Sequence, residues 1–250
     1  MIKGKSANRK QAKRAGGRAT HRSLKEQLIL AGKVLVAEGQ DDFTRGHISF
    51  RLPDDTNLFF MKAHSIGLDE ITMQNILTID LEGNVVAGEA RRHSEVYIHS
   101  EILKARPDVN CVIHTHPTYS IALSATGRPL RCYSQPGALF YGAVGLYDET
   151  INLIRSPAMG AGVARALGKG RAVLLKNHGV VVTGASVAEA VIGTLMLENG
   201  AMVQLLVEAA GDAAPEFSPA DIEKLKADIS QPEQFAINFD YLARRLRRRG

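Results

Sequence analysis

The chain has 250 residues, of which 45% are hydrophobic and 23% are charged. This composition is typical of a soluble globular protein with enough interior for one large core. No apolar run approaches the roughly 18 residues of a membrane span, and the basic N-terminus lacks the apolar block of a secretory signal. Cys111 and Cys132 are too few for a disulfide framework. We therefore expect a cytoplasmic protein with no membrane partner.

The formal net charge of +5 comes from the two ends of the chain. Residues 1–25 carry nine Lys/Arg and no acid, and residues 244–249 carry five arginines. The rest of the chain has 17 basic and 26 acidic residues. A folded nucleic-acid-binding domain usually has a basic face on its body together with a recognition motif. We therefore predict no specific nucleic-acid partner and keep binding by the basic ends as an alternative.

The basic segment 1–22 is expected to be a flexible arm. Ser23 and Glu26 form a capping-box pattern, which predicts that a helix begins there. Gly39 ends this helix. The helix has one apolar stripe, which would face a core and consists of Leu24, Leu28, Ala31 and Leu35.

Short β-type runs broken by turns follow, and then a helix over residues 94–105. Arg106-Pro107-Asp108 ends this helix, because the residue before proline is disfavoured in the helical region. The predicted turns are Pro53-Asp54-Asp55 and Glu82-Gly83-Asn84. The predicted strands cover residues 48–51, 58–61 and 76–79.

Two more predicted strands, 172–175 and 180–183, follow a β-type run at 111–116 and are joined by Lys176-Asn177-His178-Gly179. Ser186 and Glu189 form a second capping box, which opens a helix over 187–210. Ser218 with Pro219 starts another helix, since proline suits the first helical turn. This alternation of helices with short strands favours one α/β domain.

Three histidines and one glutamate indicate a metal site. His114 and His116 are two residues apart on a predicted strand, so both imidazoles project to the same face. His178 lies at a bend between two apolar strands and would be placed to complete a three-histidine set. Glu95 begins a helix and would be a fourth ligand or a general base beside the metal.

Other interpretations of the same histidines remain open. A lone His-x-His pair is often two hydrogen-bonded or surface histidines. A cupin-type dioxygenase also contains His-x-His, but the glutamate expected soon after the pair is absent, and Ser120 and Ile121 stand there.

Over residues 23–210 the sequence resembles the class II aldolase/adducin family. By this resemblance, His114, His116 and His178 are metal ligands, and Glu95 is the catalytic acid/base that can also touch the metal. The implied fold is a three-layer αβα sandwich with a mainly antiparallel central sheet. The matching pieces, in order, are Gly46-His47-Ile48-Ser49, Gly67-Leu68 through Thr72, Ser94-Glu95 with His99, Val112-Ile113-His114-Thr115-His116-Pro117, and Leu174-Leu175-Lys176-Asn177-His178-Gly179.

Three departures from the family pattern change the expected substrate. Sugar-phosphate aldolases that this chain resembles have Gly-Asn at Gly46-His47, Thr-Gly at His64-Ser65 and Ser-Ser at His93-Ser94. Those small residues cradle the substrate phosphate, and histidines would fill that pocket. The sequence looks closer to the branch that decarboxylates hydroxylated aromatic or pyridine dicarboxylates, such as 3-hydroxy-2-methylpyridine-4,5-dicarboxylate.

The function predicted from this resemblance is a metal-dependent carbon–carbon lyase, with decarboxylation favoured over aldol cleavage or epimerisation. The cofactor is one divalent ion per subunit, Mn²⁺ or Zn²⁺, and the substrate is a small carboxylated molecule. Residues 23–212 are the expected catalytic domain and residues 213–250 a helical tail with an arginine-rich end. The predicted substrate-binding residues are His47, His64, Ser65, His93, Ser94 and Arg92, because planar carboxylates accept charge-assisted hydrogen bonds.

The resemblance also implies a homotetramer with active sites at subunit interfaces, to which Tyr241 of the tail is a candidate contributor. Phe235, Phe239 and Leu242 predict that the tail packs onto the body. A competing interpretation, from another class, is a non-catalytic interaction protein like the adducin head domain. The four intact metal-site residues argue against it.

Overall fold

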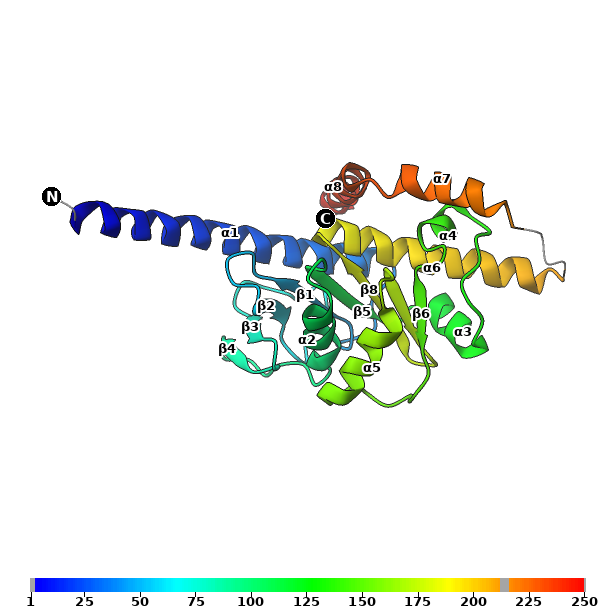
Figure 1. Ribbon diagram of the computed structural model, residues 1–250, viewed down its shortest axis with the longest axis horizontal. Coiled ribbons are helices and arrows are strands. Elements are labelled where there is room, and N and C mark those ends of the chain that lie inside the picture. The colour runs from blue at the N-terminus through cyan, green and yellow to red at the C-terminus, as the bar shows by residue number, and fades with distance from the viewer. Residues whose placement is uncertain (1–2, 212–215, 250) are drawn as a thin grey trace.

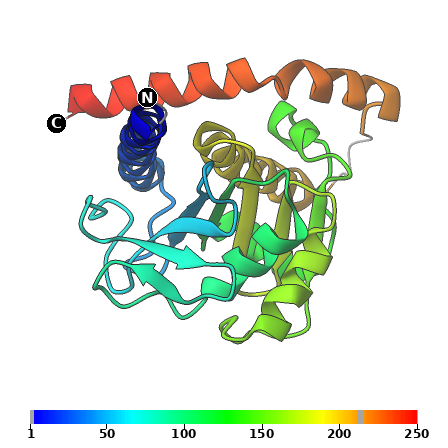
Figure 2. The ribbon, with the colours of Figure 1, turned by 60° about the vertical axis from the view of Figure 1, so that its left-hand side comes forward.

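The computed structural model describes residues 3–211 and 216–249, and their side chains for 20–211 and 216–248. Within these residues eight strands form one sheet between two layers of helices (Figures 1 and 2). The strands are β1 (His47–Arg51), β2 (Leu58–Lys62), β3 (Ile76–Asp80), β4 (Val85–Ala87), β5 (Cys111–Thr115), β6 (Val144–Tyr147), β7 (Ala172–Leu175) and β8 (Gly179–Gly184). The helices are α1 (Lys3–Ala37), α2 (Val96–Ala105), α3 (Thr118–Thr126), α4 (Gln135–Leu139), α5 (Pro157–Leu167), α6 (Val187–Ala209), α7 (Pro219–Ile229) and α8 (Pro232–Arg249).

The sheet has the strand order β4-β3-β2-β1-β5-β8-β7-β6. Neighbouring strands pair antiparallel except β6 and β7, which are parallel. A parallel pair needs a crossover connection, and α5 supplies it between β6 and β7. The sheet is therefore mixed and mainly antiparallel, which confirms the predicted type.

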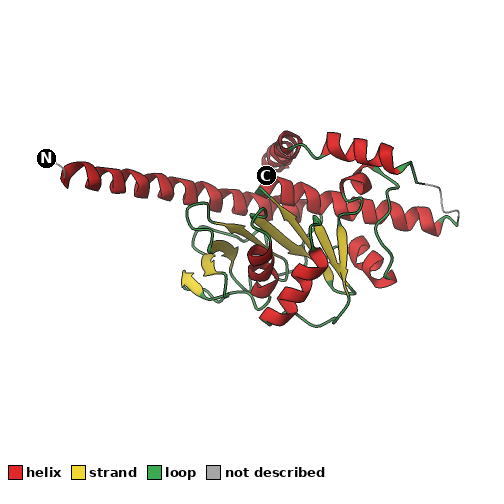
Figure 3. Cartoon of the chain, viewed as in Figure 1, coloured by secondary structure: helices red, strands yellow, loops and turns green. Residues whose placement is uncertain are grey.

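The two faces of the sheet carry separate apolar cores, because side chains alternate along a strand. Ile113 of β5 packs with residues of α1 and α6 on one face. Its neighbour Val112 packs with residues of α2 and α5 on the other face. Figure 3 shows the strands enclosed between these helices. The predicted three-layer αβα sandwich is thus confirmed.

Helix α6 has the length and apolar composition of a membrane-crossing helix. The search for long apolar runs in the sequence did not predict this. Half of its most apolar window is buried within the molecule. One side packs on β8 and β5, and other contacts are made by α3, α4 and α8. These contacts are those of a core helix of the sandwich.

The capping residues account for several helix starts. The hydroxyl of Ser186 accepts a hydrogen bond from the backbone N–H of Glu189 and caps α6, and Ser218 caps α7 through the N–H of Asp221. All six predicted strands are present, with ends shifted by one residue at most. The sequence interpretation did not include β4, α3, α4, β6 or α5.

The predicted helix start at Ser23 is wrong. Helix α1 is continuous from Lys3 to Ala37 and passes through Ser23 without a break. Residues 3–22 are rich in alanine, lysine and arginine, which are good helix formers, and contain no proline. The first turns of α1 extend beyond the body of the molecule (Figure 1).

The C-terminal helix packs on the body, as predicted. Phe235 and Phe239 are buried in the core that α1 and α6 share, and Leu242 is partly buried against it. Arg245 forms an ion pair with Glu38, the residue that directly follows α1. Helix α8 is therefore held on the body both by apolar packing and by an ion pair.

We expect Phe235→Ala to lower the free energy of unfolding by about 3 kcal/mol, because it leaves a cavity where a fully buried ring packs. Urea denaturation followed by circular dichroism measures this change. Ile237→Ala on the same helix is the control, since that side chain is 49% exposed and its loss should cost under about 1 kcal/mol. Equal losses for the two variants would contradict the packing of α8.

Candidate active site

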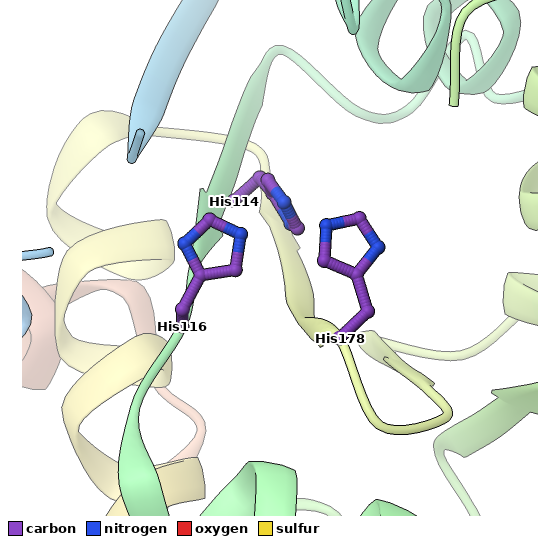
Figure 4. Close-up of side chains that lie close together, drawn as sticks. All are labelled: His114, His116 and His178. Carbon is purple, nitrogen blue, oxygen red and sulfur yellow. The ribbon is translucent and has the colours of Figure 1, made fainter. Parts of the chain in front are cut away.

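The three predicted metal-binding histidines meet at one end of the sheet. His114 lies near the end of β5, and His116 follows two residues later on the same face. His178 precedes β8, the antiparallel neighbour of β5. One ligand nitrogen from each ring lies within 4.8 Å of the others, and Figure 4 shows the three rings around one space.

Helix α2 carries Glu95 to the same place. It packs over the sheet face to which His47, Ser49 and His114 project, with Glu95 as its N-cap residue. The carboxylate oxygens lie 3.7 Å from His178 Nε2 and 4.0 Å from His114 Nε2. Glu95 therefore stands close enough to a bound ion to be a ligand or an acid/base.

The donor set fits a divalent metal. His114 Nδ1 lies 2.8 Å from the carbonyl oxygen of Val180 and donates to it, which leaves Nε2 with its lone pair free for a metal. Buried ring nitrogens of His114 and His178 have no hydrogen-bond partner among the described residues. Unpartnered buried polar atoms are rare, and a metal ion would give His114 Nε2 and one nitrogen of His178 a partner. A second possible donor set, His47, Glu95 and His114, shares two of these groups.

Burial keeps these imidazoles neutral. Desolvation lowers the pKa of His114 well below its usual value and lowers the pKa of His178 to about 4. It also lowers the pKa of His116, with Asp42 opposing the shift. A neutral imidazole is the form that binds a metal, so the site is ready for one at neutral pH.

The Glu95 carboxyl group shows the opposite shift. It is 2% exposed, and desolvation raises its pKa, while the backbone N–H of Ile154 and the charge of Arg155 oppose the shift. The Ile154 N–H donates to Oε1 at 2.9 Å. A buried carboxyl group with a raised pKa is suited to proton transfer near neutral pH.

A buried chain of hydrogen bonds lies behind Glu95. The Ser49 hydroxyl lies 2.6 Å from His99 Nδ1, and His99 Nε2 lies 2.6 Å from His47 Nδ1. His47 Nε2 faces Glu95 Oε2 at 3.7 Å. Each neutral ring has one donor and one acceptor nitrogen. The hydrogen bond between Ser49 and His99 and the one between His99 and His47 therefore have the same donor-to-acceptor direction. His47 and His99 therefore form a fixed, buried wall behind the carboxylate.

Asp42 supports the outer side of the cluster. Its carboxylate lies 2.9 Å from His116 Nδ1 and 2.6 Å from the guanidinium of Arg45. Carboxylates beside metal-binding histidines fix the orientation of the ring. Neither Asp42 nor Arg45 was predicted from sequence, because no motif links residues 42–45 to His116.

A cavity of about 540 Å³ opens in front of the histidines and Glu95. Of the predicted substrate-binding residues, His64, His93 and Ser94 line it. Ser65 lies beside it, with its hydroxyl 2.5 Å from His64 Nδ1. His47 is fully buried behind the cavity, and Arg92 lines a neighbouring one. Tyr241 is 46% exposed on α8 and does not line the cavity.

The rim of this cavity holds strained backbone. Within the described residues, Phe43, Ser65 and Asn177 are the non-glycine residues with positive φ, at 51°, 65° and 58°. Each is next in sequence to a residue that lines the cavity, and Asn177 lines it itself. Such conformations cost about 1–3 kcal/mol each and cluster at functional sites.

Segment 151–155 forms one wall of the cavity and was also missed. Ile151, Leu153 and Arg155 line the cavity, with Ile151 63% exposed. The segment joins β6 to α5, neither of which was predicted, so nothing in the sequence placed it near Glu95. The local pattern in this segment is Ser156-Pro157, a serine cap followed by a proline in the first turn, which indicates the start of α5.

The chain belongs to the class II aldolase and adducin family, whose N-terminal domain model matches residues 26–205. The resemblance inferred from its motifs is thereby confirmed. A 3,4-dihydroxyphthalate decarboxylase from Arthrobacter keyseri is 31% identical over 82% of this chain and 87% of its own. The meiotically up-regulated gene 14 protein of Schizosaccharomyces pombe is 32% identical over 73% and 72%.

The fold is also that of solved structures. An L-fuculose 1-phosphate aldolase from Glaciozyma antarctica superposes with a TM-score of 0.82 and 28% identity, over 92% of this chain and 90% of that one. Decarboxylases and aldolases both break carbon–carbon bonds. The comparisons therefore support a lyase, and the His/Glu cluster supports a metal requirement.

We expect His178→Ala to reduce the content of bound divalent metal far below that of the wild type, because one of three imidazole ligands is lost. Elemental analysis after gel filtration measures the content. His21→Ala is the matched control, since His21 contacts Asp54 on the surface. Wild-type metal content in His178→Ala would contradict the three-histidine site.

Lys62 gives a second prediction. It is 1% exposed and donates to the carbonyl groups of Thr44 and Ile66, and desolvation lowers its pKa from 10.5 to about 8. Between these pH values the unfolded chain binds more protons than the folded one, so stability rises with pH. From pH 8 to 10.5, wild-type protein should gain roughly 1–3 kcal/mol relative to Lys62→Met.

Urea denaturation at a series of pH values gives this difference. The exposed Lys169→Met variant is the control and should follow the wild type. A difference between wild type and Lys62→Met that stays constant over the range would show that Lys62 keeps its ordinary pKa in the folded protein.

Proposed function

We propose that this protein is a metal-dependent carboxy-lyase that removes a carboxylate from a hydroxylated aromatic or pyridine dicarboxylate. The observation that carries the proposal is the lining of the cavity in front of the metal-binding histidines. There His64 and His93 stand where sugar-phosphate aldolases of the family have small phosphate-cradling residues. The 31% identity to a 3,4-dihydroxyphthalate decarboxylase supports it.

In this proposal His114, His116 and His178 hold one divalent ion, Mn²⁺ or Zn²⁺, with Glu95 at its side. The ion would supply Lewis acidity, drawing electron density from the substrate's hydroxyl and carboxylate oxygens. The neutral state of the three imidazoles and the unpartnered nitrogens of His114 and His178 support this assignment. Three histidines and a carboxylate suit either metal.

Glu95 performs the proton transfer. When carbon dioxide leaves, the electron pair of the broken carbon–carbon bond stays on the ring carbon, and a proton must reach that carbon. Glu95 in its protonated form delivers the proton and regains one from water. Burial raises its pKa and so favours the protonated form. The Ile154 N–H holds the carboxyl group in place while the proton moves.

The remaining residues bind and orient the substrate. His64, Ser65, His93 and Ser94 supply polar groups for the ring substituents, and His47 acts from behind through Glu95. Ile151 and Leu153 give the cavity an apolar wall suited to a planar ring. The enzyme would work in the cytoplasm, where Cys111 and Cys132 stay reduced, as a homotetramer with sites at subunit interfaces.

An aldolase is the second candidate, supported by the structural likeness to an L-fuculose 1-phosphate aldolase. The same metal and the same glutamate serve both reactions, because each leaves negative charge on carbon. The two histidines in the cavity disfavour a sugar phosphate. A non-catalytic, adducin-like role is disfavoured by the intact cluster.

We expect Glu95→Gln to abolish turnover while retaining most of the bound metal, because the amide keeps the shape but carries no transferable acid proton. Metal content and carbon dioxide release are measured on the same preparation. Glu101→Gln on the same helix is the matched control and should keep near-normal turnover. Near-normal turnover of Glu95→Gln would show that another group moves the proton.

The substrate is tested with a panel of hydroxylated aromatic and pyridine dicarboxylates, assayed for carbon dioxide release with the metal-loaded protein. Release from at least one panel member is expected. Inactivity on the whole panel, together with cleavage of a sugar phosphate, would reverse the order of the two candidates.

A further inference from the structure

A second cavity, of about 400 Å³, adjoins the one described above. Three of its five lining residues are arginines, and the lining consists of Arg91, Arg92, Ser94, Tyr97 and Arg155. Ser94 and Arg155 line both cavities. A ligand seated at the histidine cluster can therefore extend past these two residues into the second cavity.

The three arginines lack counter-charges. In the part of the chain that the structure describes, no carboxylate lies within ion-pairing distance of Arg91, Arg92 or Arg155. Other arginines of the body form ion pairs, such as Arg106 with Asp108 and Arg171 with Glu189. Three guanidinium groups around one cavity repel one another, and a bound anion would relieve the repulsion.

Contacts with the catalytic cavity hold the arginine-bearing segments in place. Arg92 lies 5.5 Å from the Tyr97 ring and donates to the carbonyl of His93. The carbonyl of Arg91 accepts from the backbone N–H of His64 at 2.9 Å. The hydrogen bond from Ile154 to Glu95 fixes the residue just before Arg155. The Arg92 guanidinium is held directly, and the backbone on which Arg91 and Arg155 stand is fixed, so binding an anion costs these side chains less freedom.

The second cavity lies next to the catalytic groups. Ser94 and Arg155 line both cavities, and Arg155 directly follows Ile154, whose N–H donates to Glu95. An anion in the second cavity would therefore lie close to the reacting groups.

We propose that the arginine-lined cavity is an anion subsite, which binds a second acidic group of the substrate while the reacting carboxylate lies at the histidine cluster. The recognised group is a carboxylate or a phosphate, since both match the bidentate geometry of guanidinium. This inference rests on the proposed function. It narrows the substrate class to molecules whose two acidic groups can occupy both cavities at once.

The first experiment measures anion binding without metal or turnover. Inorganic phosphate is titrated into metal-stripped full-length protein in 150 mM salt, with isothermal titration calorimetry as the readout. Arg91→Gln and Arg155→Gln should each raise the Kd about tenfold, the loss expected for one charge-assisted hydrogen bond, and the double variant should bind no phosphate detectably.

Arg165→Gln is the matched control, because Arg165 is exposed on α5 and pairs with Glu149, outside both cavities. It should keep the wild-type Kd. An unchanged Kd in Arg91→Gln and Arg155→Gln, or an equal change in Arg165→Gln, overturns the subsite.

The second experiment identifies the source of the anion. With the best dicarboxylate of the panel and metal-loaded protein, phosphate should inhibit competitively, and Arg91→Gln should raise KM with little change in kcat. Inhibition that lowers kcat without affecting KM would overturn the substrate subsite in favour of a free-anion effector site.

The two proposals fail separately. Arginine-dependent phosphate binding by a protein that decarboxylates nothing would retain the anion subsite and overturn the proposed reaction. Carbon dioxide release unaffected by Arg91→Gln and Arg155→Gln would retain the reaction and overturn the subsite.

Discussion

Burial of the Glu95 carboxyl group among neutral imidazoles is the constraint on which the rest of the structure depends, because an isolated buried charge is costly. The fold meets this cost with three kinds of partner. The Ile154 N–H donates to one oxygen, His47 and His178 face the carboxylate, and Arg155 places a positive charge nearby. These partners come from three separate segments, which are 151–155, β1 and the turn before β8, so the arrangement exists only when the whole sandwich has formed.

Strand register and helix spacing place these groups together. His47 of β1 pairs directly with His114 of β5, so their rings stand side by side on the face that α2 covers. Along α2, Glu95 and His99 are four residues apart and project toward the same side. A shift of one residue in the pairing of β1 with β5 would turn a histidine to the opposite face of the sheet. The apolar pattern that fixes this strand register therefore also keeps the histidines together.

Local signals in the sequence were sufficient for much of the fold and for the centre of the site. Alternating apolar strands, the serine caps of α6 and α7, and the His-x-His pair are all short-range patterns. The parts that were missed depend on distant contacts. Strand β6 and helix α5 contain glycines that weaken their patterns, and Gly160 is needed because α5 approaches the backbone of Tyr97 closely. Asp42, Arg45 and Arg155 reach the site only through tertiary packing, which no spacing rule encodes.

At the far edge of the sheet, β4 has a consequence for the behaviour of the protein at high concentration. This strand has three residues, all exposed, and its pairing with β3 is interrupted by a register shift at Thr78/Ile79. A long, regular edge would offer unpaired backbone groups to another chain. Because β4 is short and irregular, it offers few backbone groups with which a strand of another chain could pair. This edge of the sheet is therefore protected against aggregation by strand pairing.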